Sequence, residues 1–134
     1  MHRREFLSLV APCAAVLGLQ SKAVTPQSIG LILVGQSWCS ACKDAAATLY
    51  PALSRADLPF MIASQDGQPI PPFKEFVDGR GHPIAMGIAT VPVLLFVHTP
   101  TQEIIARIDG FTNPRRYLRQ IRSTLIAAKE AGYV

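Results

Sequence analysis

Trp38-Cys39-Ser40-Ala41-Cys42 is the stretch of this chain that decides its fold, and it directly follows the apolar run Ile32-Leu33-Val34. Two cysteines three positions apart share one face of a helical turn, so their sulfurs can meet as a disulfide or separate as thiols. If Cys39 lies at the N-terminus of a helix, unpaired backbone N–H groups and the helix dipole stabilise its thiolate. A strand, a short turn and a Cys-x-x-Cys helix therefore predict electron transfer between pairs of cysteines.

Residues 1–23 have the pattern of an export signal. Arg3 and Arg4 precede an apolar stretch, Phe6–Leu19, which is too short for a comfortable membrane span. The small residues of Ser21-Lys22-Ala23 suit cleavage by a signal peptidase. We therefore expect a mature domain of residues 24–134 that is exported to the periplasm.

The export route and the fate of this segment have alternatives. Arg3-Arg4-Glu5-Phe6-Leu7 matches the twin-arginine pattern, but the general secretory route stays open. An uncleaved segment would tether the protein to the membrane. A lipid anchor on Cys13 is disfavoured, because Pro12 stands where such a site normally has a small residue.

Removal of the signal changes both the cysteine count and the charge. Of the three cysteines of the chain, Cys13 is lost, so that Cys39 and Cys42 can pair only with each other or with a partner. The net charge falls from +4 to +2, because the signal carries three basic residues and one acid. The remaining charge gives no reason to expect nucleic acid as a partner. One small domain is long enough for a real core.

The order of elements follows from apolar runs and turn residues. Strands are expected at residues 31–34, 58–63, 93–97 and 103–108, with a helix over 41–53 and a short helix over 73–77. Pro51 is a kink or a boundary of the first helix. Asn113 caps a last helix, with Pro114 at its first position.

The last helix has two different faces. Its buried face is predicted to consist of Tyr117, Leu118, Ile121 and Leu125, and four arginines lie largely opposite: Arg115, Arg116, Arg119 and Arg122. We interpret these arginines as a solvated face, and otherwise as a docking patch for an acidic partner. The whole order predicts an α/β fold, in which a βαβ unit and a ββα unit form a mixed four-stranded sheet with helices on both faces.

With this order of elements, the chain resembles the thioredoxin superfamily over nearly all of the mature domain. Trp38-Cys39-Ser40-Ala41-Cys42-Lys43 is similar to that family's Trp-Cys-x-x-Cys-Lys. Gly87–Val97, with Val91-Pro92 inside it, resembles the segment that carries a cis-proline opposite the active site. Gly110 matches a glycine before the last helix. The resemblance implies a thioredoxin fold and a thiol–disulfide exchange site.

Within this site, each residue receives an expected role. Cys39 is the nucleophile and Cys42 resolves the mixed disulfide that Cys39 forms with a partner. A cis Pro92 would place the backbone of Val91 beside the cysteines, where a substrate strand can pair with it. Trp38 shields the dithiol and contacts partners, and Lys43 acts on the thiolate electrostatically.

Each role has a plainer alternative. The cysteine pair could be a permanent staple, although so short a loop would stabilise the fold only weakly. Pro92 could be an ordinary trans proline that starts an edge strand, Trp38 a packed core residue and Lys43 a solvated lysine. His82 and His98 lie sixteen residues apart, which does not fit zinc-ligand spacing, so both are interpreted as surface or strand-end residues and no metal site is expected.

Two departures from the family concern the direction of the reaction. Thioredoxin has a buried acid six residues before its first cysteine, where this chain has Leu33. Between the cysteines, Ser40-Ala41 replaces the Gly-Pro of thioredoxin and the histidine-containing pairs of oxidising relatives. Because no imidazole stands beside Cys39, we favour a reductant over an oxidant.

The sequence thus predicts a thiol–disulfide oxidoreductase of the cell envelope, with no cofactor besides a Cys39–Cys42 disulfide. Its expected partners are thiols and disulfides of exported proteins and an upstream electron donor such as a membrane thiol reductase, and we expect a monomer. The alternative is a non-enzymatic, redox-gated adaptor or a copper-binding module that uses the same thiols. A regulator dedicated to one partner is a third hypothesis.

Overall fold

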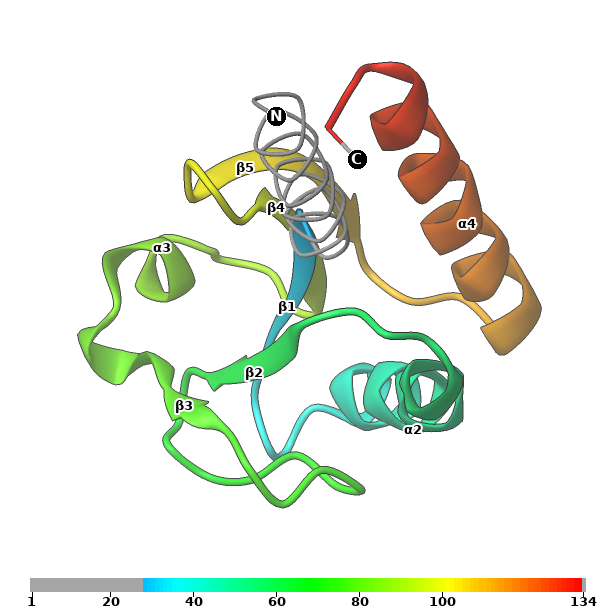
Figure 1. The fold of residues 1–134 in the computed structure, drawn as a ribbon. Helices are drawn as coiled ribbons and strands as arrows, with labels where there is room; N and C mark the ends of the chain where they lie inside the picture. The colour runs from blue at the N-terminus through cyan, green and yellow to red at the C-terminus, as the bar shows by residue number, and fades with distance from the viewer. Residues whose placement is uncertain (1–27, 134) are drawn as a thin grey trace, which may run out of the picture.

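A mixed sheet of five strands runs through the centre of the molecule (Figure 1). The computed structural model describes residues 28–133, so the predicted export signal lies outside the described residues. The strands follow one another in space as β3-β2-β1-β4-β5. Their bounds are Ile29–Gly35 for β1, Phe60–Ser64 for β2, Val77–Asp78 for β3, Val93–His98 for β4 and Glu103–Asp109 for β5.

β1 occupies the middle of the sheet because its side chains are apolar on both faces. Leu31 and Leu33 are buried in one hydrophobic cluster, whereas Val34 is buried in the other. β1 pairs in parallel with β2 and antiparallel with β4, so the predicted parallel pairing is confirmed. The four expected strands are present, and the two-residue β3 adds a fifth at the edge, paired in parallel with β2.

Helices cover both faces of the sheet, as predicted. α2 (Ser40–Arg55) and α4 (Pro114–Glu130) lie on one face (Figure 1). The single-turn α3 (Pro83–Met86) and the 3₁₀ turn η1 (Gly79–Gly81) lie on the other. Pro51 is inside α2 and does not end it. The predicted α/β arrangement of the thioredoxin type is therefore confirmed.

The start of α4 forms as its sequence predicts. Asn113 is the N-cap and its Oδ1 accepts a hydrogen bond of 2.9 Å from the backbone N–H of Arg116. Tyr117 and Ile121 are buried, but Leu118 is 36% exposed, so its place on the buried face was wrong. The buried face of α4 is therefore narrower than predicted. It includes the small side chain of Ala128 and does not include Leu118.

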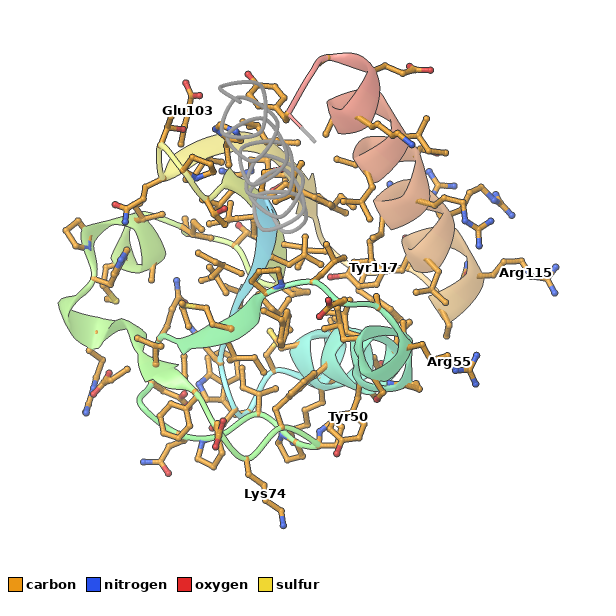
Figure 2. All side chains as sticks on the ribbon, in the orientation of Figure 1. Tyr50, Arg55, Lys74, Glu103, Arg115 and Tyr117 are labelled. Atoms are coloured by element: carbon orange, nitrogen blue, oxygen red, sulfur yellow. The ribbon has the colours of Figure 1, made fainter. Side chains whose placement is uncertain are left out.

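The four arginines of α4 face solvent, as expected. Figure 2 shows Arg115 extending away from the molecule, whereas Tyr117 points from the same helix toward the interior. No helix within residues 28–133 is long and apolar enough to cross a membrane.

The short helix expected over residues 73–77 is wrong. Residues 73–76 have no regular structure, and the short helix instead lies at Pro83–Met86. Val77 pairs with Ala63 of β2, which extends the backbone there. Phe73 and Phe76 are spaced as on a helix, yet both pack against the core from an irregular segment. Their partial burial against the core, and not a helical backbone, explains why both positions are apolar.

Because α3 is a single turn, it covers only part of its face. A groove of about 460 Å³ remains there, with Ile32, Leu95, Val97 and Ile104 among its lining residues. Neither cysteine lines this groove. The thiols therefore lie elsewhere, at the end of β1 where α2 begins.

Candidate functional site: a dithiol at the start of a helix

Cys39 is the N-cap of α2, and three residues separate it from the end of β1. Its backbone is extended (φ −84°, ψ 116°), and its Sγ accepts a hydrogen bond of 3.2 Å from the backbone N–H of Cys42. The side chain is partly exposed. The sulfur thus occupies the position that an oxygen usually takes at a helix start, where a negative charge is stabilised. The expected location of Cys39 is confirmed.

Cys42 lies one turn into α2 and is fully buried. Burial and a hydrogen bond with Cys39 raise the pKa of the Cys42 thiol to about 12, although a hydrogen bond from the backbone of Gln36 acts in the opposite direction. Cys42 therefore keeps its proton at neutral pH. Both cysteines are free thiols in this structure. One accessible and one buried, protonated sulfur are what a two-step exchange requires.

Gly35 allows the end of β1 to approach Cys42 closely. A Cβ atom at this glycine would lie 3.0 Å from the Sγ of Cys42 and 3.2 Å from the Cδ1 of Ile70. Such contacts are too short for an undisturbed side chain. The absence of a side chain at position 35 thus makes room for the buried sulfur.

We expect Gly35→Ala to displace Cys42 and to lower the free energy of unfolding by about 1–3 kcal/mol, the usual effect of overpacking. Denaturant unfolding of the reduced protein measures this effect. Gly81→Ala is the matched control, because a Cβ there meets no atom within 4 Å. Equal stability of the Gly35→Ala variant and wild type would show that Cys42 has free space.

The raised pKa of Cys42 predicts a pH dependence of stability. In the unfolded chain this thiol ionises near its ordinary pKa of 9.0, whereas in the folded protein it stays protonated up to about pH 12. Between these values the unfolded state binds fewer protons, so the stability of the reduced protein falls as pH rises above about 9. Thermal unfolding of reduced wild type between pH 8 and about pH 11 measures this slope.

Cys42→Ser is the control for this pH dependence. Burial also raises the pKa of Tyr117, so this tyrosine contributes a slope of the same sign in both proteins. Burial is the larger cause of the raised pKa of Tyr117 and is present in both proteins, whereas the smaller electrostatic effect of Cys42 on Tyr117 is lost in Cys42→Ser. The difference in slope therefore measures Cys42 together with its effect on Tyr117. Identical slopes in wild type and Cys42→Ser would contradict the burial of a protonated thiol.

Val91 and Pro92 lie beside the start of residues 36–38, the loop between β1 and Cys39, which we call the cysteine loop. Val34 of β1 is opposite Val93 of β4, so the residues just before Val93 run alongside the residues just after Val34. The Val91–Pro92 peptide bond is cis, and the trans alternative is therefore wrong. The carbonyl of Pro92 accepts a hydrogen bond of 2.8 Å from the N–H of Gly110, whose φ of +80° favours glycine.

The remaining residues predicted for the site lie on its outside. Trp38 is 72% exposed, which excludes the alternative of a packed core tryptophan. Ser40 and Lys43 are exposed and Ala41 is partly exposed. Leu33 is fully buried in the apolar core, so the acid of thioredoxin has no counterpart at this position.

The two histidines are surface or strand-end residues, as interpreted from the sequence. His82 is exposed at the start of α3. His98 is the last residue of β4, where its Nδ1 lies 2.9 Å from the Thr101 hydroxyl. In the part of the chain from 28 to 133, no three His, Cys, Asp or Glu side chains are grouped so that they could hold a metal ion.

Sequence reasoning missed a polar group at the end of β2. Ser64, Gln65 and Asp66, which we call the β2-end cluster, contact the loop that precedes Cys39. The N–H of Ser37 lies 3.2 Å from Oδ2 of Asp66, and the Ser37 hydroxyl donates to the same oxygen. The Ser64 hydroxyl lies 2.7 Å from Oδ1 of Asp66. Two loops from different parts of the chain are thus joined.

Asp66 is ionised at neutral pH. Partial burial alone would raise its pKa, but hydrogen bonds from Ser37 and Ser64 outweigh burial, so the pKa of Asp66 lies below its ordinary value. A signal for this cluster was present in the sequence, because polar residues directly follow a strand that was expected to run parallel to the strand before Cys39. The carboxyl ends of parallel strands meet at one edge of a sheet.

Solved structures share this fold. Reduced thioredoxin pre-protein from Schistosoma mansoni is 13% identical, with a TM-score of 0.51 over 81% of this chain and 89% of that one. Thiol:disulfide interchange protein DsbE from Chlorobium tepidum is 16% identical, with a TM-score of 0.57 over 75% and 79%. Thioredoxin Mala s 13 from Malassezia sympodialis is 19% identical, with a TM-score of 0.52 over 78% and 82%. At these identities the likeness shows the fold alone.

Sequence comparison defines the family more narrowly. A search of curated proteins found no match. The family model described as "TraF: F plasmid transfer operon protein" matches residues 23–112, which is more than half of the chain and includes Cys39, Cys42 and the Val91-Pro92 segment. This protein therefore belongs to the TraF family and has a thioredoxin fold.

Proposed function

We propose that this protein is a thiol–disulfide oxidoreductase of the cell envelope that reduces disulfides of partner proteins. One observation carries the proposal: a partly exposed Cys39 caps α2 while Cys42 is buried one turn further on. Because Cys42 is inaccessible and protonated at neutral pH, only Cys39 can be reached by a partner. One accessible and one buried cysteine suit thiol–disulfide exchange better than a permanent structural disulfide.

The reaction has two steps. The Cys39 thiolate attacks one sulfur of a partner disulfide, which forms a mixed disulfide and releases the other partner sulfur as a thiolate. Cys42 then loses its proton and attacks the Sγ of Cys39, which releases the second partner thiolate. The partner disulfide gains two electrons and Cys39 and Cys42 become a disulfide. The two released thiolates take up two protons: one is the proton that Cys42 lost, and the other comes from the solvent, which received the proton of Cys39 when its thiolate formed.

The reducing direction rests on which groups surround the dithiol. Dithiols of this kind span potentials from about −270 mV in reductants to about −120 mV in strong oxidants. Oxidants stabilise the thiolate of the first cysteine, and neither Ser40 nor Ala41 supplies an imidazole for that purpose. The negative charge of Asp66 also raises the pKa of Cys42, although burial and the hydrogen bond with Cys39 are larger causes.

The location and the partners belong to the same proposal. Arg3-Arg4 and the apolar stretch that follows support export to the periplasm. There the protein would act as a monomer on thiols and disulfides of exported proteins. An upstream donor, such as a membrane thiol reductase, would return the Cys39–Cys42 disulfide to the dithiol.

Reduction of insulin with dithiothreitol as electron source tests the proposal. We expect catalytic turnover by the full chain above the rate with dithiothreitol alone. Insulin reduction at the uncatalysed rate, together with retention of one copper(I) ion by the reduced protein, would contradict the proposal and favour the copper-binding alternative.

A further inference from the structure

Gln65 joins the two loops that frame the dithiol. Its Oε1 accepts a hydrogen bond of 2.7 Å from the Nε2 of Gln36. Its Nε2 donates to the carbonyl of Ala85 at 2.7 Å and to the carbonyl of Ile88 at 2.8 Å. Both amide hydrogens and the amide oxygen are therefore used. Three of the four hydrogen bonds that a glutamine amide can form are made, and together they hold the side chain in one position.

One end of this network reaches the cysteine loop. Gln36 is three residues before Cys39, and its carbonyl accepts a hydrogen bond of 3.3 Å from the N–H of Cys39. The backbone N–H of Gln65 also donates to the carbonyl of Gly35, at 2.8 Å. Asp66 holds Ser37 in the same loop. The end of β2 thus fixes the chain that carries Cys39.

The other end reaches the segment that leads to Val91. Ala85 lies in α3, and Ile88 is a buried residue three positions before Val91. The hydrogen bonds that the N–H groups of Gly87 and Ile88 donate go to Pro83 and Ala85, so they stay within this segment. The two bonds from Gln65, by contrast, connect the segment to the sheet and, through Gln36, to the cysteine loop.

We propose that Gln65 is a positioning residue that sets the spacing between Cys39 and the Val91 backbone, and thereby the docking of an extended partner segment. The proposal rests on the function proposed above, because a partner must reach both places at once. An extended segment that pairs with Val91 can present its sulfur to Cys39 only if the two loops keep their spacing. A small disulfide needs Cys39 alone.

Gln65→Leu tests this role, because leucine fills similar space but forms none of the three hydrogen bonds. We expect the KM for insulin to rise about tenfold, in line with the loss of one or two net hydrogen bonds in the docked complex. The rates at which Cys39 reacts with iodoacetamide and with the small disulfide of Ellman's reagent stay within about twofold of wild type, since the cap position of Cys39 is unchanged.

Gln65→Glu separates the two ends of the network. A carboxylate can still accept from Gln36, but it cannot donate to Ala85 and Ile88, whose carbonyl oxygens it would repel. We expect this variant to raise the KM for insulin as Gln65→Leu does. The matched control is Gln68→Leu, which removes an exposed amide from the same loop and should leave the KM unchanged.

Hydrogen exchange provides a readout that does not depend on turnover. If Gln65 holds the segment, the backbone amides of residues 85–91 exchange faster in Gln65→Leu than in Gln68→Leu. Unchanged exchange of this segment overturns the proposal, whether or not wild type reduces insulin. An unchanged KM in an active enzyme also overturns the positioning proposal.

An equal loss of Cys39 reactivity, insulin reduction and thermal stability would show that Gln65→Leu is generally unfolded, which also contradicts a positioning role. Failure of wild type itself to reduce insulin, with faster exchange in Gln65→Leu, would reject the proposed function only.

Discussion

We expect Cys39→Ser to reduce insulin at the uncatalysed rate, because a serine hydroxyl cannot form the mixed disulfide. Cys42→Ser should behave differently. Its Cys39 can still attack a partner disulfide, but the buried thiol that resolves the intermediate is missing. This variant is therefore expected to accumulate a covalent complex with its partner, which is measured as a mass increase that dithiothreitol reverses.

The pair of variants tests the order of attack that the burial of the two sulfurs predicts. Cys39 is partly exposed and Cys42 is fully buried. Catalytic turnover by Cys39→Ser, or a stable partner complex formed by Cys39→Ser and not by Cys42→Ser, would reverse the assignment. Identification of the protein captured by Cys42→Ser in the cell envelope would also distinguish a general reductant from a regulator of one partner.

Tyr117 is the residue whose truncation should destabilise the fold most. It is 1% exposed, and its ring packs edge-on against Phe111 with a centroid distance of 5.0 Å. Figure 2 shows it pointing inward from α4. We expect Tyr117→Ala to lower the free energy of unfolding by about 3–5 kcal/mol, because the large cavity left beneath α4 cannot collapse completely. Denaturant unfolding measures this loss.

Tyr117→Phe is the matched control. Within residues 28–133 the buried hydroxyl of Tyr117 has no hydrogen-bond partner, so its removal abolishes no bond. We therefore expect the phenylalanine variant to be at least as stable as wild type. If both variants lose several kcal/mol, the hydroxyl and not the ring is what stabilises the protein.

Local sequence signals predicted the fold because they agreed with the packing. Asn113 and Pro114 start α4, and the apolar run before the cysteines became the central strand β1. The errors fall where two explanations of one pattern compete. Phe73 and Phe76 have helical spacing, but they pack against the core from an irregular segment next to the edge strand β3. A two-residue strand such as β3 has too little sequence to produce an alternating pattern.

Within the candidate site, the sequence predicted the residues that can be recognised from a short spacing or from a family motif. The spacing of Cys39 and Cys42 places both sulfurs on the first turn of α2, and Val91-Pro92 was recognised by resemblance. The sequence could place Gln65 at the end of β2 but could not give its contacts, because its partners Gln36, Ala85 and Ile88 meet only when β1, β2 and the segment before β4 come together. Hydrogen bonds between residues that are far apart in the chain produce no repeating pattern in the sequence.

A redox titration of Cys39 and Cys42 shows whether the two cysteines interconvert between a dithiol and a disulfide. The full chain is equilibrated over a series of reduced-to-oxidised ratios of dithiothreitol and of glutathione, its free thiols are alkylated, and the masses are measured. We expect a single two-electron transition between dithiol and disulfide, with a midpoint nearer to about −270 mV than to about −120 mV. Cysteines that form no disulfide with each other across this range would contradict a function in thiol–disulfide exchange.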